Sequence, residues 1–413
     1  MTCPTDVTHA LRDDPGSQLE STTLVIYEHT REQWLFGEPV CTCLPESLTL
    51  LSALTSLSFH YCSSLSRLPD SLGQLSALTT LCMYMCDALS QLPDSLGQLT
   101  SLSTLRIQRC GAITELPESV CQLAMLHTLV LSMCDVRKLP SSLGALPMLS
   151  KLDISGNKRL ERLPDTLGEL TKLTSLIMQD CVKVTSLPDS LGLLTSLIEL
   201  DLYSCQLLTQ LPASLGLLPS LRTLDLSWCI ALRRLPESFG KLLPERMGHP
   251  VTSLSLEWGW YLQELPASLG QMSMLVTLIL RLCYSLLRLP DSIGQLRALK
   301  RIELNECRML TMLPNSLGQL TLLEALKLDG CRSLFRLPAS LGRLPNLHQL
   351  TISECPIARE FRNTVTLRSY LYAHDHELKL MLIVLQDIRR RIGGLPPELW
   401  CYVCSFLPVE IIM

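Results

Sequence analysis

The sequence is poor in charged and aromatic side chains. Charged residues make up 18% and aromatic residues 5% of the 413 residues, and 35 Lys and Arg against 39 Asp and Glu give a formal net charge of −4. An average soluble chain has about 25% charged residues. Phosphate contact requires a basic stripe, so this balance argues against a nucleic-acid partner. The 96 leucines, close to one residue in four, also exclude a disordered chain.

Long apolar runs are missing as well. No segment reaches the roughly 18 uninterrupted apolar residues of a membrane span, and the best candidate, residues 378–385, contains Lys379. The N-terminal stretch MTCPTDVTHALRDDPGS is polar and acidic, unlike a secretory signal peptide, and no Asn-x-Ser/Thr sequon is present. We therefore expect no membrane span and a cytoplasmic location, where the 18 cysteines would remain reduced.

Signatures of catalysis and of cofactor binding are missing too. There is no GxxxxGK[S/T] phosphate loop, and His376-Glu377 is not followed by the second histidine of a zinc-binding HExxH. The pair Cys401-x-x-Cys404 has no second cysteine pair with which to hold zinc. We predict no catalytic residue, no cofactor and no metal site, and hence a protein that is not an enzyme.

What is abundant is one unit used many times. Leu-Pro dipeptides place proline at positions 45, 69, 93, 117, 140, 164, 188, 212, 236, 266, 290, 314 and 338. The spacing is 24 residues, apart from one of 23 and one of 30. One residue is missing between Cys134 and Leu139, and six are added near 245–250. We interpret both irregularities as tolerated changes in surface loops.

The aligned units read LxxLxLxxCxxLxxLPxSLGxLxx. The alternation in LxLxx predicts a short, half-buried strand. The segment after proline predicts a brief helical turn, with the Ser or Thr two residues after each proline as its N-cap. Glycine follows in eleven of the thirteen units, Thr49 and Cys121 being the exceptions.

Eleven of the cysteines share one position of the unit, which we call the ladder position. They are Cys62, Cys86, Cys110, Cys134, Cys181, Cys205, Cys229, Cys283, Cys307, Cys331 and Cys355, and Asn157 and Gly259 take the other two places. A metal site needs ligands that converge on one point, whereas these residues are spread along an axis. The spacing therefore predicts a buried structural ladder of small apolar thiols.

This pattern resembles the leucine-rich repeat, LxxLxLxxN/CxL, over roughly Leu44 to Phe361. The LPxSLGxL half is similar to intracellular repeats of plant disease-resistance proteins and of Ras-pathway scaffold proteins. The resemblance implies an α/β solenoid shaped as a curved horseshoe, with parallel strands on the concave face and short helical turns on the convex face. It also implies that each ladder side chain points inward and hydrogen-bonds backbone groups of the loop leaving the strand.

The resulting domain organisation has three parts. Residues 1–43 form a tail and a degenerate N-terminal cap, in which residues 23–27 resemble an extra strand. Residues 44–361 form thirteen repeats. Residues 362–413 differ in composition and are expected to be a helical C-terminal tail that caps the last repeat.

Because the leucines of LxxLxLxx point inward, the residues between them line the concave face and are the candidates for partner binding. These candidates are Tyr84, Arg106, Arg109, Asp201, Tyr203, Asp225, Trp228, Glu257, Trp258 and Trp260, with Asp153, Asp180 and Glu199 in the same acidic stretch. Exposed tryptophan and tyrosine are favoured interface anchors, and surrounding carboxylates favour a basic partner. The alternative is that the aromatic rings pack across neighbouring strands and stabilise the sheet.

The C-terminal tail resembles the opening of an F-box, LPxELxxxIxxxL. The matching positions are Leu395, Pro396, Leu399, Val403 and Leu407. The resemblance implies contact with a Skp-type adaptor and a substrate-recruiting role in a cullin-type ubiquitin ligase. Only about the first third of an F-box is present, and the usual order of F-box before repeats is reversed. We favour an amphipathic helix that covers the last repeat, with the F-box-like segment as the alternative interpretation.

These observations together predict a non-enzymatic scaffold for protein–protein interaction, acting in intracellular signalling. Rigid strands would hold its side chains in place, so that binding need not order a loop. The ubiquitin-ligase subunit is the alternative function.

Overall fold

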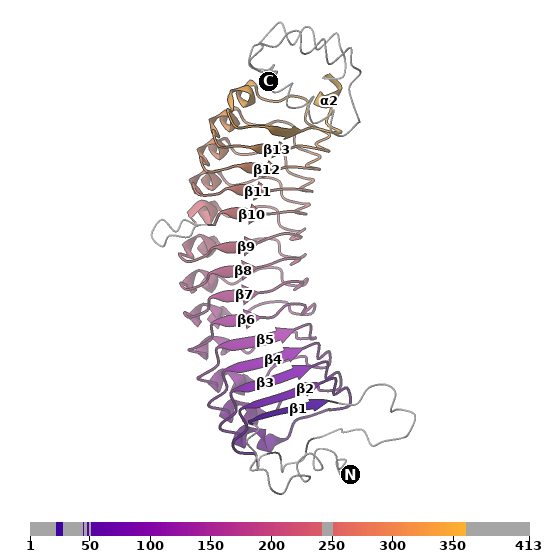
Figure 1. The fold of residues 1–413 in the computed structure, drawn as a ribbon, viewed down its shortest axis with the longest axis vertical. Coiled ribbons are helices and arrows are strands. Elements are labelled where there is room, and N and C mark those ends of the chain that lie inside the picture. The colour runs from indigo at the N-terminus through magenta and orange to yellow at the C-terminus, as the bar shows by residue number, and fades with distance from the viewer. Residues whose placement is uncertain (1–21, 28–43, 45–47, 49–50, 242–250, 361–413) are drawn as a thin grey trace, which may run out of the picture. The chain divides into compact units, whose positions relative to one another are not determined.

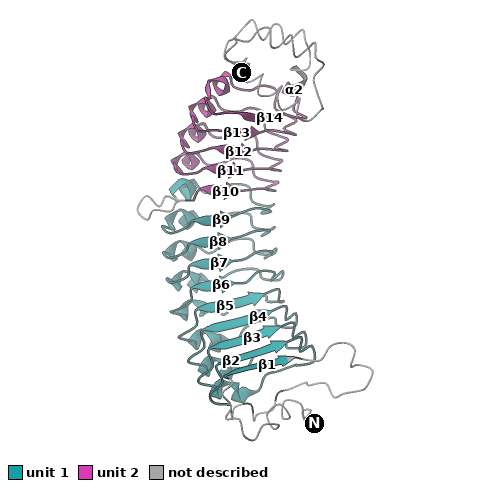
Figure 2. Ribbon diagram, in the orientation of Figure 1, with its two compact units in different colours: residues 1–251 teal, residues 252–413 magenta. Residues whose placement is uncertain are grey.

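The computed structural model describes residues 22–27, 44, 48, 51–241 and 251–360. Its compact units are unit 1, Met1–Val251, and unit 2, Thr252–Met413 (Figure 2). The predicted N-terminal tail, the six-residue insertion and the predicted C-terminal helical tail lie outside the described residues. None of the helices in the described part is both long and apolar enough to cross a lipid bilayer.

Each unit is built on parallel strands that follow one another in chain order (Figure 1). The strands of unit 1 are β1 Thr23–Tyr27, β2 Ser56–His60, β3 Thr80–Tyr84, β4 Thr104–Gln108, β5 Thr128–Ser132, β6 Lys151–Asp153, β7 Ser175–Ile177, β8 Glu199–Asp201 and β9 Thr223–Asp225. Those of unit 2 are β10 Ser253–Ser255, β11 Thr277–Ile279, β12 Arg301–Glu303, β13 Ala325–Lys327 and β14 Gln349–Thr351. The predicted extra strand at residues 23–27 is confirmed as β1, which pairs in parallel with β2.

Short 3₁₀ helices return the chain from one strand to the next along the other side of each unit (Figure 1). They are η3 Asp70–Gln74, η4 Asp94–Gln98, η5 Glu118–Gln122, η6 Leu143–Ala145, η7 Asp165–Glu169, η8 Asp189–Leu193, η9 Ala213–Leu217 and η10 Glu237–Lys241 in unit 1, and η11 Ala267–Gln271, η12 Asp291–Gln295, η13 Asn315–Gln319 and η14 Ala339–Arg343 in unit 2. A short α-helix, α2 Ile357–Glu360, follows β14. The fold is thus the predicted solenoid of parallel strands and short turns.

The prediction that serine or threonine caps these turns is wrong. Proline itself occupies the N-cap in most turns, as Pro69 does at φ −69° before η3; Ser142 is the N-cap of η6, but no side-chain cap hydrogen bond forms at either place. The following serine lies inside the turn, where small size matters more than hydrogen bonding. The hydroxyl groups of Ser95, Ser119, Ser190, Ser214, Ser292, Ser316 and Ser340 are buried without a hydrogen-bond partner in the described part of the chain.

The glycine of each turn is required by close approach of the next turn. A Cβ atom built on Gly168 would lie 2.2 Å from the carbonyl oxygen of Ser190, and one on Gly216 would lie 2.2 Å from that of Ser238. Real Cβ atoms do not come so close to a backbone oxygen. Glycine in the repeat therefore allows consecutive turns to stack closely. The sequence pattern showed that glycine recurs but not that close stacking requires it.

The ladder side chains are buried and tie each repeat to the one before. In unit 1, Sγ of Cys181, Cys205 and Cys229 donates to a backbone carbonyl 27 residues earlier at 3.2, 3.3 and 3.3 Å. In unit 2 the corresponding distances from Cys283, Cys307, Cys331 and Cys355 are 3.2, 3.1, 3.1 and 2.9 Å. The predicted buried ladder is confirmed, and every cysteine in the described part is a free thiol.

These thiols are expected to resist alkylation in the folded protein. Burial raises the pKa of Cys181, Cys229 and Cys283 to about 12, so almost no thiolate, the nucleophilic form, is present near neutral pH. Among the described cysteines only Cys82, which lies on β3, is not fully buried. We expect iodoacetamide at pH 8 to label Cys82 before Cys181, Cys229 or Cys283, measured by peptide mass spectrometry. Ladder cysteines that react as fast as Cys82 would contradict a closed core.

The residue directly before each ladder position turns the chain out of the strand. At this turn position φ is positive in eleven residues other than glycine in the described part: Tyr61, Met85, Arg109, Met133, Asp180, Ser204, Trp228, Trp258, Leu282, Glu306 and Glu354. Gly156 and Gly330 take the same conformation. Non-glycine residues adopt this left-handed region at a cost of roughly 1–2 kcal/mol each, so each repeat keeps a strained corner.

We call the segment between the ladder position and the next Leu-Pro pair the exit loop. The missing residue shortens one exit loop: the loop of residues 135–138 has four residues, whereas the neighbouring exit loops have five. Its helical turn η6 has three residues, whereas η5 and η7 have five. The Glu118 carboxylate of η5 connects η5 to the residues just before η6, because it accepts hydrogen bonds from the backbone N–H of Ser141 at 2.8 Å and from the Ser142 hydroxyl. These hydrogen bonds, that from the Ser142 hydroxyl first, lower the pKa of Glu118 to about 2.

Candidate functional site

The outward side chains of β6 to β9 and of the turns that follow them form an acidic surface on unit 1, which we call the acidic strand face. It comprises Asp153, Asp180, Glu199, Asp201 and Asp225. Asp201 and Asp225 are register partners on neighbouring strands, so their Cα atoms are separated by the spacing of about 4.8 Å between strands. Like charges placed side by side in this way are unfavourable in the absence of a cation.

The aspartates of this face are held in place by the backbone. Asp153, Asp201 and Asp225 each accept on Oδ1 the N–H of the residue two positions further along, at 3.0, 3.0 and 2.8 Å. Each contact is an Asx turn, which aspartate or asparagine can form equally. The hydrogen bond needs an oxygen but no charge, so the folding of the turn alone does not explain why aspartate stands at all three positions.

Counter-charges on this face are few. The ion pairs recorded in the described part of unit 1, Lys138 with Glu115 and Arg159 with Asp135, lie on the exit loops. Lys151 and Arg222 are exposed at the starts of β6 and β9, and neither forms an ion pair with the described residues. Five carboxylates against two cations leave the acidic strand face with an excess of negative charge.

The strand face of unit 2 carries similar carboxylates, but these are compensated. Lys327 Nζ lies 2.7 Å from Glu303 Oε1, and Arg281 lies 3.4 Å from Glu257. Asp329 instead accepts hydrogen bonds from Asn305, Thr351 and the backbone of Ser353. In the described part of the chain, strand-face carboxylates without an ion pair are therefore concentrated on unit 1, where Glu199 accepts from the Ser175 hydroxyl and Asp201 from the Gln179 amide, both neutral groups.

Three further candidates of unit 1 lie at its N-terminal end, whereas Tyr203 lies in the turn that follows β8. Tyr84 on β3 contacts Tyr61 edge to face, with ring centroids 5.5 Å apart, and contacts His60 at 6.1 Å. Arg106 on β4 and Arg109 in the following turn are exposed. The aromatic rings pack across neighbouring strands, as the alternative interpretation stated, while both arginines remain available to a partner.

Each of the three tryptophans lies in a turn or loop that follows a strand. Trp228 is a turn-position residue of unit 1, Trp258 is one of unit 2, and Trp260 lies beyond the ladder position at the start of an exit loop. The Trp260 ring packs against Trp258 at 6.3 Å and stacks on Tyr284 at 6.0 Å. Trp260 follows the ladder residue Gly259, so it lies in the exit loop and outside the LxxLxLxx segment that lines the strand face.

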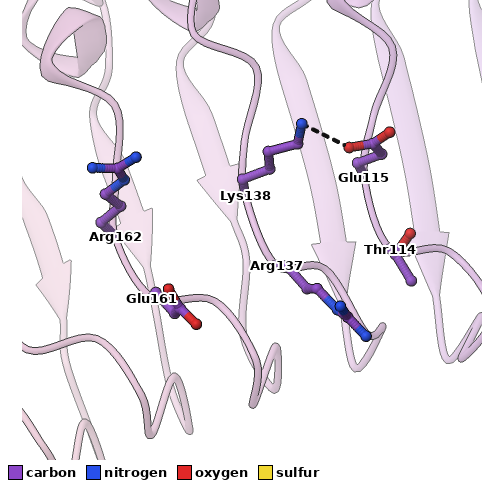
Figure 3. Close-up of a pocket in the computed structure, with 6 residues that line it drawn as sticks. All are labelled: Thr114, Glu115, Arg137, Lys138, Glu161 and Arg162. Carbon is purple, nitrogen blue, oxygen red and sulfur yellow. Dashed lines mark ion pairs between the residues drawn. The ribbon is translucent and has the colours of Figure 1, made fainter.

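A charged pocket of about 560 Å³ lies beside the shortened exit loop of unit 1 (Figure 3). It is lined by Thr114, Glu115, Arg137, Lys138, Glu161 and Arg162. Lys138 pairs with Glu115 at 2.9 Å, and the charged lining residues are all exposed to solvent. The arrangement offers water and ions no barrier and brings no nucleophile next to a base.

The F-box-like positions Leu395, Pro396, Leu399, Val403 and Leu407 lie outside the described residues.

Comparison with known proteins identifies the repeat. Residues 118–248, about a third of the chain, match the family model of a leucine-rich repeat region. A leucine-rich-repeat protein of Leptospira interrogans is similar in structure at 24% identity and a TM-score of 0.50, covering 80% of this chain and 91% of that chain. No curated protein matches the sequence.

A chain of the Toll–Spatzle complex of Drosophila is similar at 22% identity and a TM-score of 0.59, covering 81% of this chain and 42% of that chain. Identities this low show the fold alone. The family match at residues 118–248, the shared fold and the thirteenfold LxxLxLxx unit lead to one conclusion: the chain folds as a leucine-rich-repeat solenoid.

Proposed function

We propose that the protein is a non-enzymatic interaction module whose acidic strand face binds a basic segment of a partner protein. The observation that carries this proposal is the set of uncompensated carboxylates on β6 to β9, which contrasts with the paired carboxylates of unit 2. Charge complementarity of this kind speeds encounter and selects the partner. The resemblance of the repeats to intracellular signalling proteins supports a role in intracellular signalling.

The acidic strand face is suited to binding because its carboxylates are already ordered. The strands fix the backbone, and the Asx turns of Asp153, Asp201 and Asp225 fix the side chains. A partner therefore does not have to order these groups, which lowers the entropic cost of association. The same arrangement lowers stability, because Asp201 and Asp225 repel each other until a cation lies between them.

Substituting asparagine for Asp153, Asp201 and Asp225 separates charge from structure, since asparagine keeps the oxygen of the Asx turn. We expect this triple variant to lose its basic partners in affinity purification from the native host, compared by quantitative mass spectrometry. We also expect it to be more stable, by about 0.2–1 kcal/mol for each like-charge pair relieved.

The matched control substitutes asparagine for Asp94, Asp165 and Asp189, the exposed first residues of η4, η7 and η8. This control changes the net charge of the protein by the same amount as the strand-face variant, but on the side of unit 1 that carries the 3₁₀ turns. Retention of partners by this control, together with their loss from the strand-face variant, would support the proposal. Equal loss from both variants, or from neither, would refute it.

A further inference from the structure

The exit loops of unit 2 carry a second surface with a different chemistry. These loops are residues 260–264, 284–288, 308–312 and 332–336. They present five large, exposed apolar side chains: Tyr261, Leu287, Met309, Met312 and Phe335. Met312 and Phe335 are each 62% exposed. In the eight exit loops of unit 1, the only large apolar side chain of comparable exposure in the described part is Leu207.

Backbone contacts hold these loops side by side. The N–H of Ser285 donates to Trp260 O at 3.1 Å, and the N–H of Met309 donates to Tyr284 O at 3.2 Å. Arg288 and Met312 form a parallel bridge. Together the five half-exposed side chains present roughly 500 Å² of apolar surface on four adjacent loops, and exposed apolar surface of this extent is often functional.

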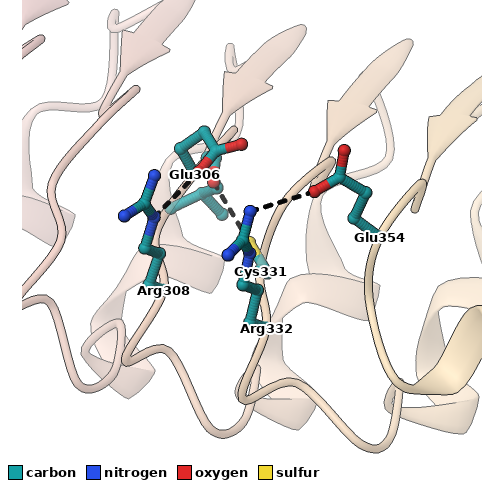
Figure 4. A network of polar contacts seen from close by, with 6 residues as sticks. Glu306, Arg308, Cys331, Arg332 and Glu354 are labelled. Carbon is teal, nitrogen blue, oxygen red and sulfur yellow. Dashed lines mark hydrogen bonds and ion pairs between the residues drawn. The ribbon is translucent and has the colours of Figure 1, made fainter.

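Arginines border this apolar surface. Arg308 lies over the Tyr284 ring at 4.3 Å and pairs with Glu306 at 3.0 Å, while Arg332 pairs with Glu354 at 3.2 Å (Figure 4). Arg288, next to Leu287, and Arg336, next to Phe335, are exposed and form no ion pair with the described residues. Two of the four bordering arginines are therefore neutralised, and the other two can take carboxylates from a partner.

We propose that this exit-loop surface of unit 2 docks an amphipathic helix of a partner protein, with an apolar stripe flanked by carboxylates. Four loops at about 4.8 Å spacing span roughly 15 Å, the length of about ten helical residues. The apolar stripe covers Leu287, Met309, Met312 and Phe335, and the carboxylates pair with Arg288 and Arg336. This surface is separate from the acidic strand face, which selects the opposite charge.

The charge pattern favours a protein helix over the two other candidates for this surface. An anionic bilayer needs a net basic surface, whereas Arg308 and Arg332 are each paired with a glutamate. The chain's own residues 361–413 carry six Lys and Arg against five Asp and Glu, so they offer no acidic excess to Arg288 and Arg336.

The test uses a fluorescein-labelled 14-residue helix of leucine, phenylalanine and glutamate, and its counterpart with lysine in place of glutamate. We expect the full chain to bind the glutamate peptide at least tenfold tighter in fluorescence anisotropy. Substituting glutamine for Met309, Met312 and Phe335 should weaken binding at least tenfold. Substituting alanine for Arg288 and Arg336 should abolish the preference for the glutamate peptide.

The control substitutes glutamine for Met125, Leu193 and Leu217, which are equally exposed on unit 1. It should bind the glutamate peptide within twofold of the unchanged protein. Equal affinity for the two peptides, or equal loss in patch and control variants, would overturn the proposal. Phosphatidylcholine–phosphatidylserine vesicles that bind the patch more tightly than the peptide would assign it to a membrane instead. Self-association in sedimentation that the patch variant abolishes would assign it to a second copy.

Discussion

Replacing Asn157 with alanine is expected to lower the free energy of unfolding by about 3–4 kcal/mol, because buried backbone groups left without partners cost about 1–3 kcal/mol each. Asn157 is fully buried. Its Nδ2 donates to the carbonyls of Leu131 and Ile154 at 2.6 and 2.7 Å, and its Oδ1 accepts the N–H of Val136 at 3.3 Å. Urea denaturation followed by circular dichroism measures the loss.

The effect is large because Asn157 compensates for the missing residue of the preceding repeat. In the repeat that contains Cys110, which has an exit loop of full length, the N–H of Ile113 bonds to the carbonyl of the ladder residue Cys110. Val136, in the shortened exit loop, donates to Asn157 instead. The matched control is Cys181→Ala, which removes a single thiol hydrogen bond of 3.2 Å from the next ladder position. A loss of stability no greater in Asn157→Ala than in Cys181→Ala would contradict this account.

Replacing Gly168 with alanine is expected to lower the free energy of unfolding by about 3 kcal/mol, the upper range for overpacking. The added Cβ would lie 2.2 Å from Ser190 O and 2.7 Å from Ser190 Cβ, so η7 and η8 would have to separate. Where the backbone conformation and the surrounding space suit alanine, the same substitution stabilises by about 0.4–1 kcal/mol through the unfolded chain. Here the steric term outweighs that gain, and thermal unfolding should show a lower Tm.

Gly111 provides the control, since a Cβ atom there meets nothing within 4 Å. Gly111→Ala should leave the Tm unchanged or slightly higher. Cys121 shows how the repeat accepts a side chain at the glycine position, because the turn that follows it, η6, is the three-residue one. If Gly168→Ala were as stable as Gly111→Ala, the close stacking of η7 on η8 would not be a constraint.

The repeat pattern was sufficient to predict the strands, the turns and the ladder, because each depends on leucine, proline and cysteine at fixed spacing. Even the degenerate β1 was predictable from the alternation in residues 23–27. The N-cap assignment failed for a physical reason: a capping side chain needs an extended residue just before the helix, and Pro69 and its equivalents already occupy that place. Asn157 was assigned to the ladder, but its link to the shortened exit loop required coordinates.

The candidate sites were predictable only in part. Asp201 and Asp225 were recognised as outward-facing, but the absence of a counter-charge depends on which side chains neighbouring repeats place beside them. The compensation of Glu303 by Lys327 likewise joins residues 24 positions apart. The exit-loop surface was not predicted, because its residues lie outside the LxxLxLxx segment. The apolar residues at the variable positions of the last exit loops, such as Met312 and Phe335, were the signal that could have revealed it.

The strained corner before each ladder residue limits which side chains that position can carry. The left-handed penalty comes mainly from the Cβ atom, so exchanging one unbranched side chain for another adds little further cost. The eleven non-glycine corners of the described part hold Tyr, Met, Arg, Asp, Ser, Trp, Leu and Glu, but no Val, Ile or Thr. Branching at Cβ is what this conformation resists most. Each corner can thus carry a different unbranched side chain while the backbone beneath it stays the same.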